Sequence, residues 1–91
     1  MELQEKLEKI QRECPMIPHT DAGRMFSMVR RMKAEKELEI PIPMRSSFII
    51  SARLGKAANE MSGEEWEEFY EVLAGELYMR HPELFKKIFG K

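Results

Sequence analysis

The sequence predicts an all-α protein, a small bundle or orthogonal array of four main helices with a short fifth helix at its C-terminal end. Apolar residues recur at helical spacing through most of the chain, and residues 61–79 open with a complete helix-start signal. With 91 residues, 43% of them hydrophobic and 34% charged, the composition is that of a single globular helical domain over residues 1–91.

The helix expected over residues 63–80 has the clearest pattern. Ser62 and Glu65 form a capping box, in which each side chain accepts a hydrogen bond from the backbone of the other residue. Met61 and Trp66 flank this cap at the spacing of a hydrophobic staple. We expect the apolar side of this helix to form the centre of the core, with Trp66, Phe69, Tyr70, Leu73 and Leu77.

A first helix is expected over residues 2–14, before Pro15. Leu3, Leu7, Ile10 and Cys14 follow the alternating spacing of a coiled-coil seam. Two heptads are too few for an independent coiled coil, so this stripe must pack on the core or on a second subunit. We favour packing on the core.

The next helix, over residues 21–37, has a cap at Thr20 or Asp21. Its expected buried stripe consists of Ala22, Met25, Phe26, Val29 and Met32. The last helix, over residues 82–89, begins at Pro82 and ends before Gly90, because proline suits a first helical position and glycine suits the residue after a helix.

The middle of the chain is the least determined. Two prolines, Pro41 and Pro43, predict an extended connector over residues 38–43. Residues 44–61 are interpreted as a helix, which places Ile49 on its polar side among Arg45, Arg53 and Lys56. The alternative is an α+β fold in which residues 38–51 form a small hairpin, and the sequence leaves open whether residues 44–55 are helix or partly strand.

No pattern indicates an enzyme, a metal site or a cofactor. Cys14, His19 and Asp21 are close in sequence but match no zinc-binding spacing. The glutamates between residues 64 and 71 are expected to be solvated or engaged in the helix cap, whereas catalytic carboxylates need burial or close pairing. We therefore expect no catalytic, cofactor-binding or metal-binding residues.

The function that fits best is a small non-catalytic interaction or regulatory module that binds another protein or a second copy of itself. The helix over residues 63–80 loses its outer glutamates from Val72 onward, and Gly75 is costly in a helix interior unless something packs closely against it. The candidate partner-binding residues are apolar or small positions expected on helix surfaces: Leu3, Leu7, Ile10, Ile49, Val72, Gly75 and Met79.

The alternative function is that of a nucleic-acid-associated regulator, which would use basic helix faces over residues 21–37 and 44–61. The candidate anion contacts are Arg24, Arg30, Arg31, Arg45, Arg53 and Lys56. Nucleic acid is the less favoured partner because the helix over residues 63–80 presents acidic side chains.

The expected location is the cytoplasm. A lone cysteine, Cys14, cannot form an internal disulfide, and the charged segment over residues 1–10 does not resemble a signal peptide. No apolar run approaches the roughly 20 residues that a membrane span needs.

Overall fold

The computed structural model describes residues 2–17 and 19–90, and within them it confirms the all-α fold. The described residues form five α-helices, two short 3-10 turns and no strand. The helices are α1 (Leu3–Glu13), α2 (Asp21–Glu37), α3 (Ser47–Leu54), α4 (Gly63–Arg80) and α5 (Pro82–Phe89), and the 3-10 turns are η1 (Ile42–Met44) and η2 (Ala58–Glu60).

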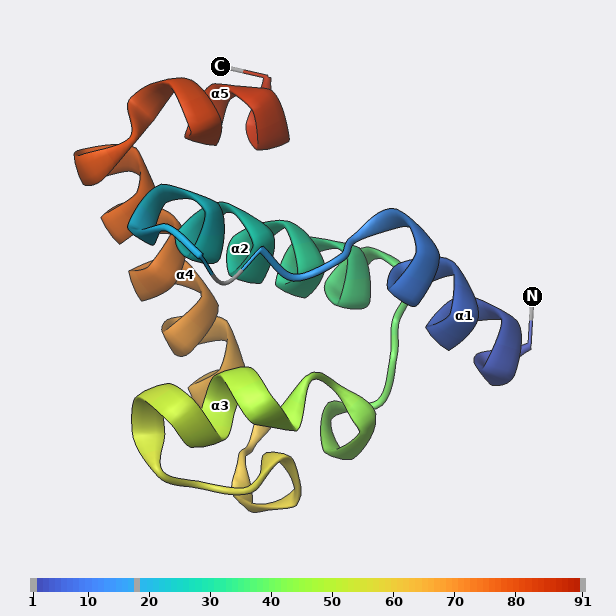
Figure 1. Cartoon of the computed structure of the whole chain (residues 1–91). Helices are drawn as coiled ribbons and strands as arrows, with labels where there is room; N and C mark the ends of the chain where they lie inside the picture. Colours follow the sequence, from blue (N-terminus) through green and yellow to red (C-terminus); the bar gives the residue numbers. More distant parts are fainter. Residues whose placement is uncertain (1, 18, 91) are drawn as a thin grey trace.

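The fold is an array of helices around the crossing of α2 and α4. Figure 1 shows α2 across the middle, α4 crossing it, α5 above, α3 below, and α1 extending from one end of α2. The apolar side of α4 is buried from Trp66 to Leu77, as predicted, and it packs against a methionine-rich stripe on α2. The residues that α2 buries there are Met25, Met28, Val29 and Met32.

The predicted capping box starts α4. The hydroxyl of Ser62 accepts a hydrogen bond from the Glu65 N–H at 3.1 Å, and the Glu65 carboxylate accepts one from the Ser62 N–H at 3.2 Å. Met61 and Trp66, the two residues of the predicted staple, are both buried in the main core cluster. The cap and the aromatic side therefore fix where α4 begins and which way it faces.

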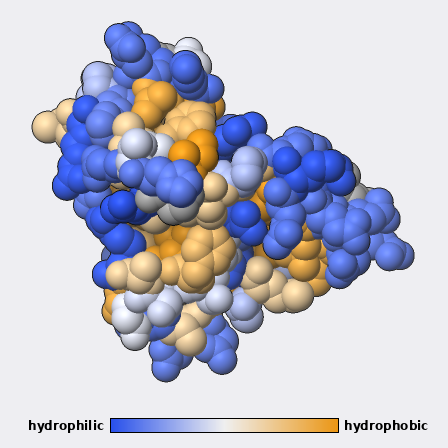
Figure 2. Space-filling view, viewed as in Figure 1, coloured by the Kyte–Doolittle hydropathy of each residue, from blue (hydrophilic) through white to orange (hydrophobic). Residues whose placement is uncertain are grey.

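The helix α1 packs on the end of α2 and forms a second, smaller core. Ile10 and Cys14 are buried with Ile40, while Leu3 and Leu7 are half-buried beside them. Figure 2 shows the hydrophobic surface that remains beside α1, bordered by hydrophilic residues. In this structure the coiled-coil-like stripe thus lies against the chain's own core.

The predicted single helix over residues 44–61 is wrong. The helix α3 ends at Leu54 because Gly55 adopts a left-handed backbone, with φ of 66°, and its N–H caps the helix on the Ser51 carbonyl. The chain then makes η2 before α4 begins. The alternative hairpin over residues 38–51 is also wrong, since the described residues there form η1 and α3.

The expected exposure of Ile49 is likewise wrong. The helix α3 is shorter than predicted and its start faces the core, so Ile49 is only 1% exposed and lies next to the buried Ile50. The extended connector predicted over residues 38–43 is wrong for most of its length, because residues 38–39 form a turn at the end of α2 and Ile42 and Pro43 belong to η1, which leaves only residues 40–41 between them.

The C-terminus of α2 is closed by a left-handed residue that is not glycine. Glu39 has φ of 55°, its N–H binds the Lys36 carbonyl, and the Ile40 N–H binds the Glu35 carbonyl. This is a Schellman motif, and Ile40 makes the accompanying hydrophobic contact near Ala34. A side chain at the left-handed position costs energy that the buried Ile40 offsets.

We predict that Glu39→Gly stabilises the protein. The left-handed conformation costs a non-glycine residue about 1–2 kcal/mol, more than the roughly 0.5–1 kcal/mol of extra entropy that glycine loses on folding. Urea unfolding should show a gain of about 0.5–1 kcal/mol in the free energy of unfolding. The matched control, Glu71→Gly within α4, should lose about 1 kcal/mol, and a loss in both variants would contradict the prediction.

Candidate functional site

The most unusual internal feature is a buried carboxylate, Glu35 of α2, which is 2% exposed. Its Oε2 atom accepts hydrogen bonds from both the N–H and the hydroxyl of Ser46, each at 2.7 Å. Ser46 is the residue before α3, and its own hydroxyl makes no cap within that helix. Glu35 therefore provides the start of α3 with an acidic hydrogen-bond acceptor from another helix, where negative charge is favoured.

Two arginines flank this carboxylate, and together the four residues Arg31, Glu35, Arg45 and Ser46 are called the Glu35 cluster below. Arg31 donates to the Ser46 hydroxyl at 2.7 Å and to the Cys14 carbonyl at 3.2 Å. Arg45 donates to the Ile40 carbonyl at 2.7 Å, and its guanidinium lies 4.1 Å from the centre of the Trp66 ring. The cluster thus ties α2 to α1, to the connector and to the core.

Burial sets the protonation of the Glu35 cluster. It raises the pKa of the Glu35 carboxyl, an effect that the bonds from Ser46 and the nearby arginines oppose only in part. Burial also lowers the pKa of Arg45, against the attraction of Glu35. Glu35 Oε1 and Arg45 Nη1 are buried without a hydrogen-bond partner among the described residues. This carboxyl can therefore take up a proton more readily than an exposed glutamate.

A hollow of about 300 Å³ adjoins the cluster, between α1, the connector and the start of α3. A serine hydroxyl that donates to a carboxylate is also the geometry of a nucleophile and its base. Here, however, Arg31 donates a hydrogen bond to the Ser46 hydroxyl oxygen, and the Glu35 carboxylate also accepts a hydrogen bond from the Ser46 N–H. This arrangement holds the serine as a helix cap and joins two helices.

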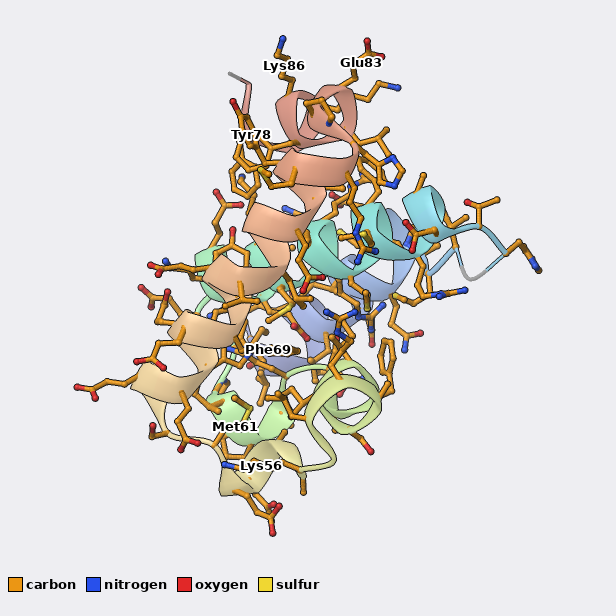
Figure 3. The ribbon with its side chains drawn as sticks, turned by 90° about the vertical axis from the view of Figure 1, so that its left-hand side faces the viewer. Lys56, Met61, Phe69, Tyr78, Glu83 and Lys86 are labelled. Carbon is orange, nitrogen blue, oxygen red and sulfur yellow. The ribbon has the colours of Figure 1, made fainter. Side chains whose placement is uncertain are left out.

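The second candidate is the outer face of α4, opposite its buried side. Its C-terminal half is apolar and exposed: Met79 is 80% exposed and Val72 is 57% exposed, while the nearby exposed Tyr78 packs edge-to-face on Phe85 of α5. A Cβ atom added at Gly75 would have no heavy atom of the described residues within 4 Å, so the close packing expected there does not occur among them. Figure 3 shows Tyr78 at the upper end of this helix and Phe69 turned inward.

The outer face continues into a groove at the other end of α4. The groove has a volume of about 350 Å³ and lies between the end of α3 and α4. Its lining residues are Leu54, Lys56, Met61, Glu65, Glu68, Phe69 and Val72. Leu54 is exposed, and Val72, which lines the groove, is also exposed on the outer face, so the groove is continuous with the apolar half of that face.

The acidic residues of α4 divide into two groups. Glu65, Glu67 and Glu76 pair with bases elsewhere in the chain, at 2.8 Å from Lys56, 3.0 Å from Lys36 and 2.7 Å from Arg53 respectively. The hydrogen bond from Lys56 also lowers the pKa of Glu65. Glu64, Glu68 and Glu71 are exposed on the outer face and form no ion pair within residues 2–17 and 19–90.

The predicted partner-binding residues do not form one surface. Val72, Gly75 and Met79 lie together on the outer face of α4. Leu3 and Leu7 lie on α1, half covered by the chain's own core, and Ile10 and Ile49 are buried. The structure therefore keeps the α4 residues as a candidate surface and removes Ile10 and Ile49 from it.

The predicted anion contacts are mostly engaged inside the chain. Arg31 and Arg45 belong to the Glu35 cluster, while Arg53 and Lys56 form the ion pairs with α4. Arg24 also has an interaction partner within the structure. Arg30 is exposed and lines a hollow of about 310 Å³ near Lys33 and Lys87.

The two histidines and the cysteine do not come together. His81 ends α4 and contacts Asp21 at the start of α2 at 3.1 Å, and this hydrogen bond lowers the pKa of Asp21. Cys14 is buried, which raises the pKa of its thiol. Within the described residues no three histidine, cysteine or acidic side chains group as metal ligands, and no helix could span a membrane.

Comparison with known proteins does not assign a family, since no family model, curated protein or solved structure matches the chain. The candidate site therefore depends on geometry alone. The sequence did contain a signal for Glu35: it continues the buried positions 25, 28, 29 and 32 of α2 at helical spacing. The stripe predicted for this helix contained only apolar residues and therefore omitted Glu35.

We predict that Glu35→Gln changes how stability depends on pH. Because the folded carboxyl has a pKa above its ordinary value of 4.5, the folded state keeps a proton that the unfolded chain has lost. The contribution of Glu35 to the free energy of unfolding is therefore full below its ordinary pKa of 4.5. It declines as the pH rises from that value through the raised pKa of the folded state. Glutamine can still accept the bonds from Ser46 but does not titrate.

Thermal unfolding between about pH 4 and about pH 7 should show the stability of Glu35→Gln, relative to the natural protein, increasing with pH. Taking the difference between the two proteins removes the effect of Asp21 and Glu65, whose lowered pKa values act in the opposite direction. A difference that stays constant over this range would show that Glu35 ionises at the same pH in the folded and unfolded states.

Proposed function

We propose that this protein is a small non-catalytic interaction module that binds another protein chain through the outer face of α4. The observation that carries the proposal is the exposed apolar strip of Val72 and Met79, two turns apart on the helix that also forms the centre of the core. Contiguous exposed apolar surface, bordered by charged groups, is typical of protein-binding sites.

The rigidity of α4 supports this proposal. Its other side is buried over five residues, and its start is fixed by the capping box. A surface on such a helix loses little conformational freedom when a partner binds, so more of the contact energy remains for affinity. Exposed methionine adds adaptability, because its thioether side chain can repack against different partners.

The Glu35 cluster supports a non-catalytic role. Its carboxylate is bound by Ser46 and shielded from solvent, which suits the joining of α2 to α3.

A reducing compartment such as the cytoplasm suits a chain whose lone cysteine is buried without a disulfide partner. We therefore place the module in the cytoplasm.

The proposal is tested by affinity capture with matched variants. We expect Met79→Glu to lose partners that the natural protein captures from its source cells, because the charge would have to be buried at the interface. Met44→Glu is the control: Met44 is exposed as well but lies on η1, so this variant should capture the same partners. Equal capture by both variants, with unchanged circular dichroism, would contradict the assignment of α4.

The alternative role as a nucleic-acid-associated regulator has less support. Nucleic-acid affinity depends on basic side chains that neutralise phosphates, and five of the six candidate cations already interact within the chain.

We predict that the protein elutes from heparin below about 0.15 M salt. Tighter retention that disappears in Arg30→Glu would support the alternative instead.

A further inference from the structure

The N-terminal half of the outer face of α4 carries acidic side chains that form no ion pair within the described residues. Glu64, Glu68 and Glu71 lie at spacings of four and three residues, so they repel each other along the helix. Each such like-charged pair destabilises an isolated helix, although the helix dipole favours acids in the first turn. The remaining acids on this helix that face other elements have basic partners.

The acidic half is continuous with the groove and with the apolar half. Glu68 lines the groove together with Phe69 and Val72, and Leu54 closes one side of it. Further along the helix, Gly75 carries no side chain and borders open space between Val72 and Met79. Figure 3 shows carboxylate-tipped side chains projecting from this side of α4, above Met61 and Lys56. One surface therefore offers an apolar channel with an acidic border.

We propose that the occupant of this surface is a basic amphipathic helix from another protein, an inference that rests on the proposed function. Its apolar residues, one or two helical turns apart, contact Leu54, Val72 and Met79, and one of them packs over Gly75, where no side chain projects. Its lysines or arginines meet Glu64, Glu68 and Glu71, which have no basic partner within the described residues.

A second copy of this chain fits the same surface less well. In a parallel arrangement of two α4 helices, the acidic halves would face each other and repel. An antiparallel arrangement would cover Glu68 and Glu71 with the apolar half of the partner and leave these carboxylates without donors. The chain's own basic amphipathic helix, α5, already packs its apolar side on the core through Leu84, Phe85 and Ile88.

The test uses two labelled helical peptides of about 18 residues, long enough to form amphipathic helices. Both carry leucine at the same positions with helical spacing, and their polar positions are lysine in one and glutamate in the other. Fluorescence anisotropy should show a dissociation constant at least about tenfold lower for the lysine peptide. Binding should also weaken as salt is added, because exposed charges are screened.

Charge-reversal variants show whether binding occurs on α4. Glu68→Lys with Glu71→Lys should raise the dissociation constant for the lysine peptide at least about tenfold. The matched control reverses Glu5 and Glu8, which are exposed on α1, and should change it by less than about twofold. Equal effects of the two double variants, or equal binding of the two peptides, would overturn the inference.

Light scattering separates this inference from the proposed function. A dimer that dissociates on Val72→Glu would make a second copy the occupant, overturning the basic helix while retaining α4 as the contact surface. Capture that depends on Met79 without selectivity for the lysine peptide would have the same consequence. If the protein is a monomer, binds neither peptide and captures the same partners after Met79→Glu, both proposals fall.

Discussion

The packing of the aromatic side of α4 against the methionine-rich side of α2 is the contact on which the rest of the structure depends. Both helices bury their stripes in it, and α5 and α3 cover the parts of α4 that α2 leaves open. Methionine is unbranched and adaptable, so it fills the irregular spaces around Trp66 and Tyr70. Because these helices pack on one side of α4, residues on its opposite side, such as Glu68, Val72 and Met79, remain exposed in the described part of the chain.

The parts of this fold that could be predicted are those determined by local chemistry. The cap at Ser62 and the proline at position 82 fixed the bounds of α4 and α5, and the apolar stripe of α4 indicated its buried side. The failures have non-local causes. Gly55 ends α3 through a left-handed backbone, and Ile49 is buried because the start of α3 is held against α2 by Glu35.

The same limit applies to the candidate sites. The apolar half of the outer face of α4 was predictable, since Val72 and Met79 lie away from a recognisable buried stripe. The sequence could not predict which basic residues remain available to a partner molecule, because their ion-pair partners come from distant parts of the chain. For example, Arg53 pairs with Glu76 and Arg80 pairs with Asp21. Internal pairing consumes much of the positive charge and leaves the acids on the outside of α4, so this nearly neutral chain has an unevenly charged surface.

The position of Trp66 makes the core optically observable. It is the single tryptophan of the chain, is fully buried, stacks on Tyr70 with ring centres 5.3 Å apart, and lies under the guanidinium of Arg45. The fluorescence of an indole is sensitive to its polarity and to nearby charge. Its emission therefore reports on both the α2–α4 contact and the segment before α3 that carries Arg45. The chain thus contains an intrinsic probe, and comparing its emission with the helix content separates loosening of the segment that carries Arg45 from loss of helix, without an added label.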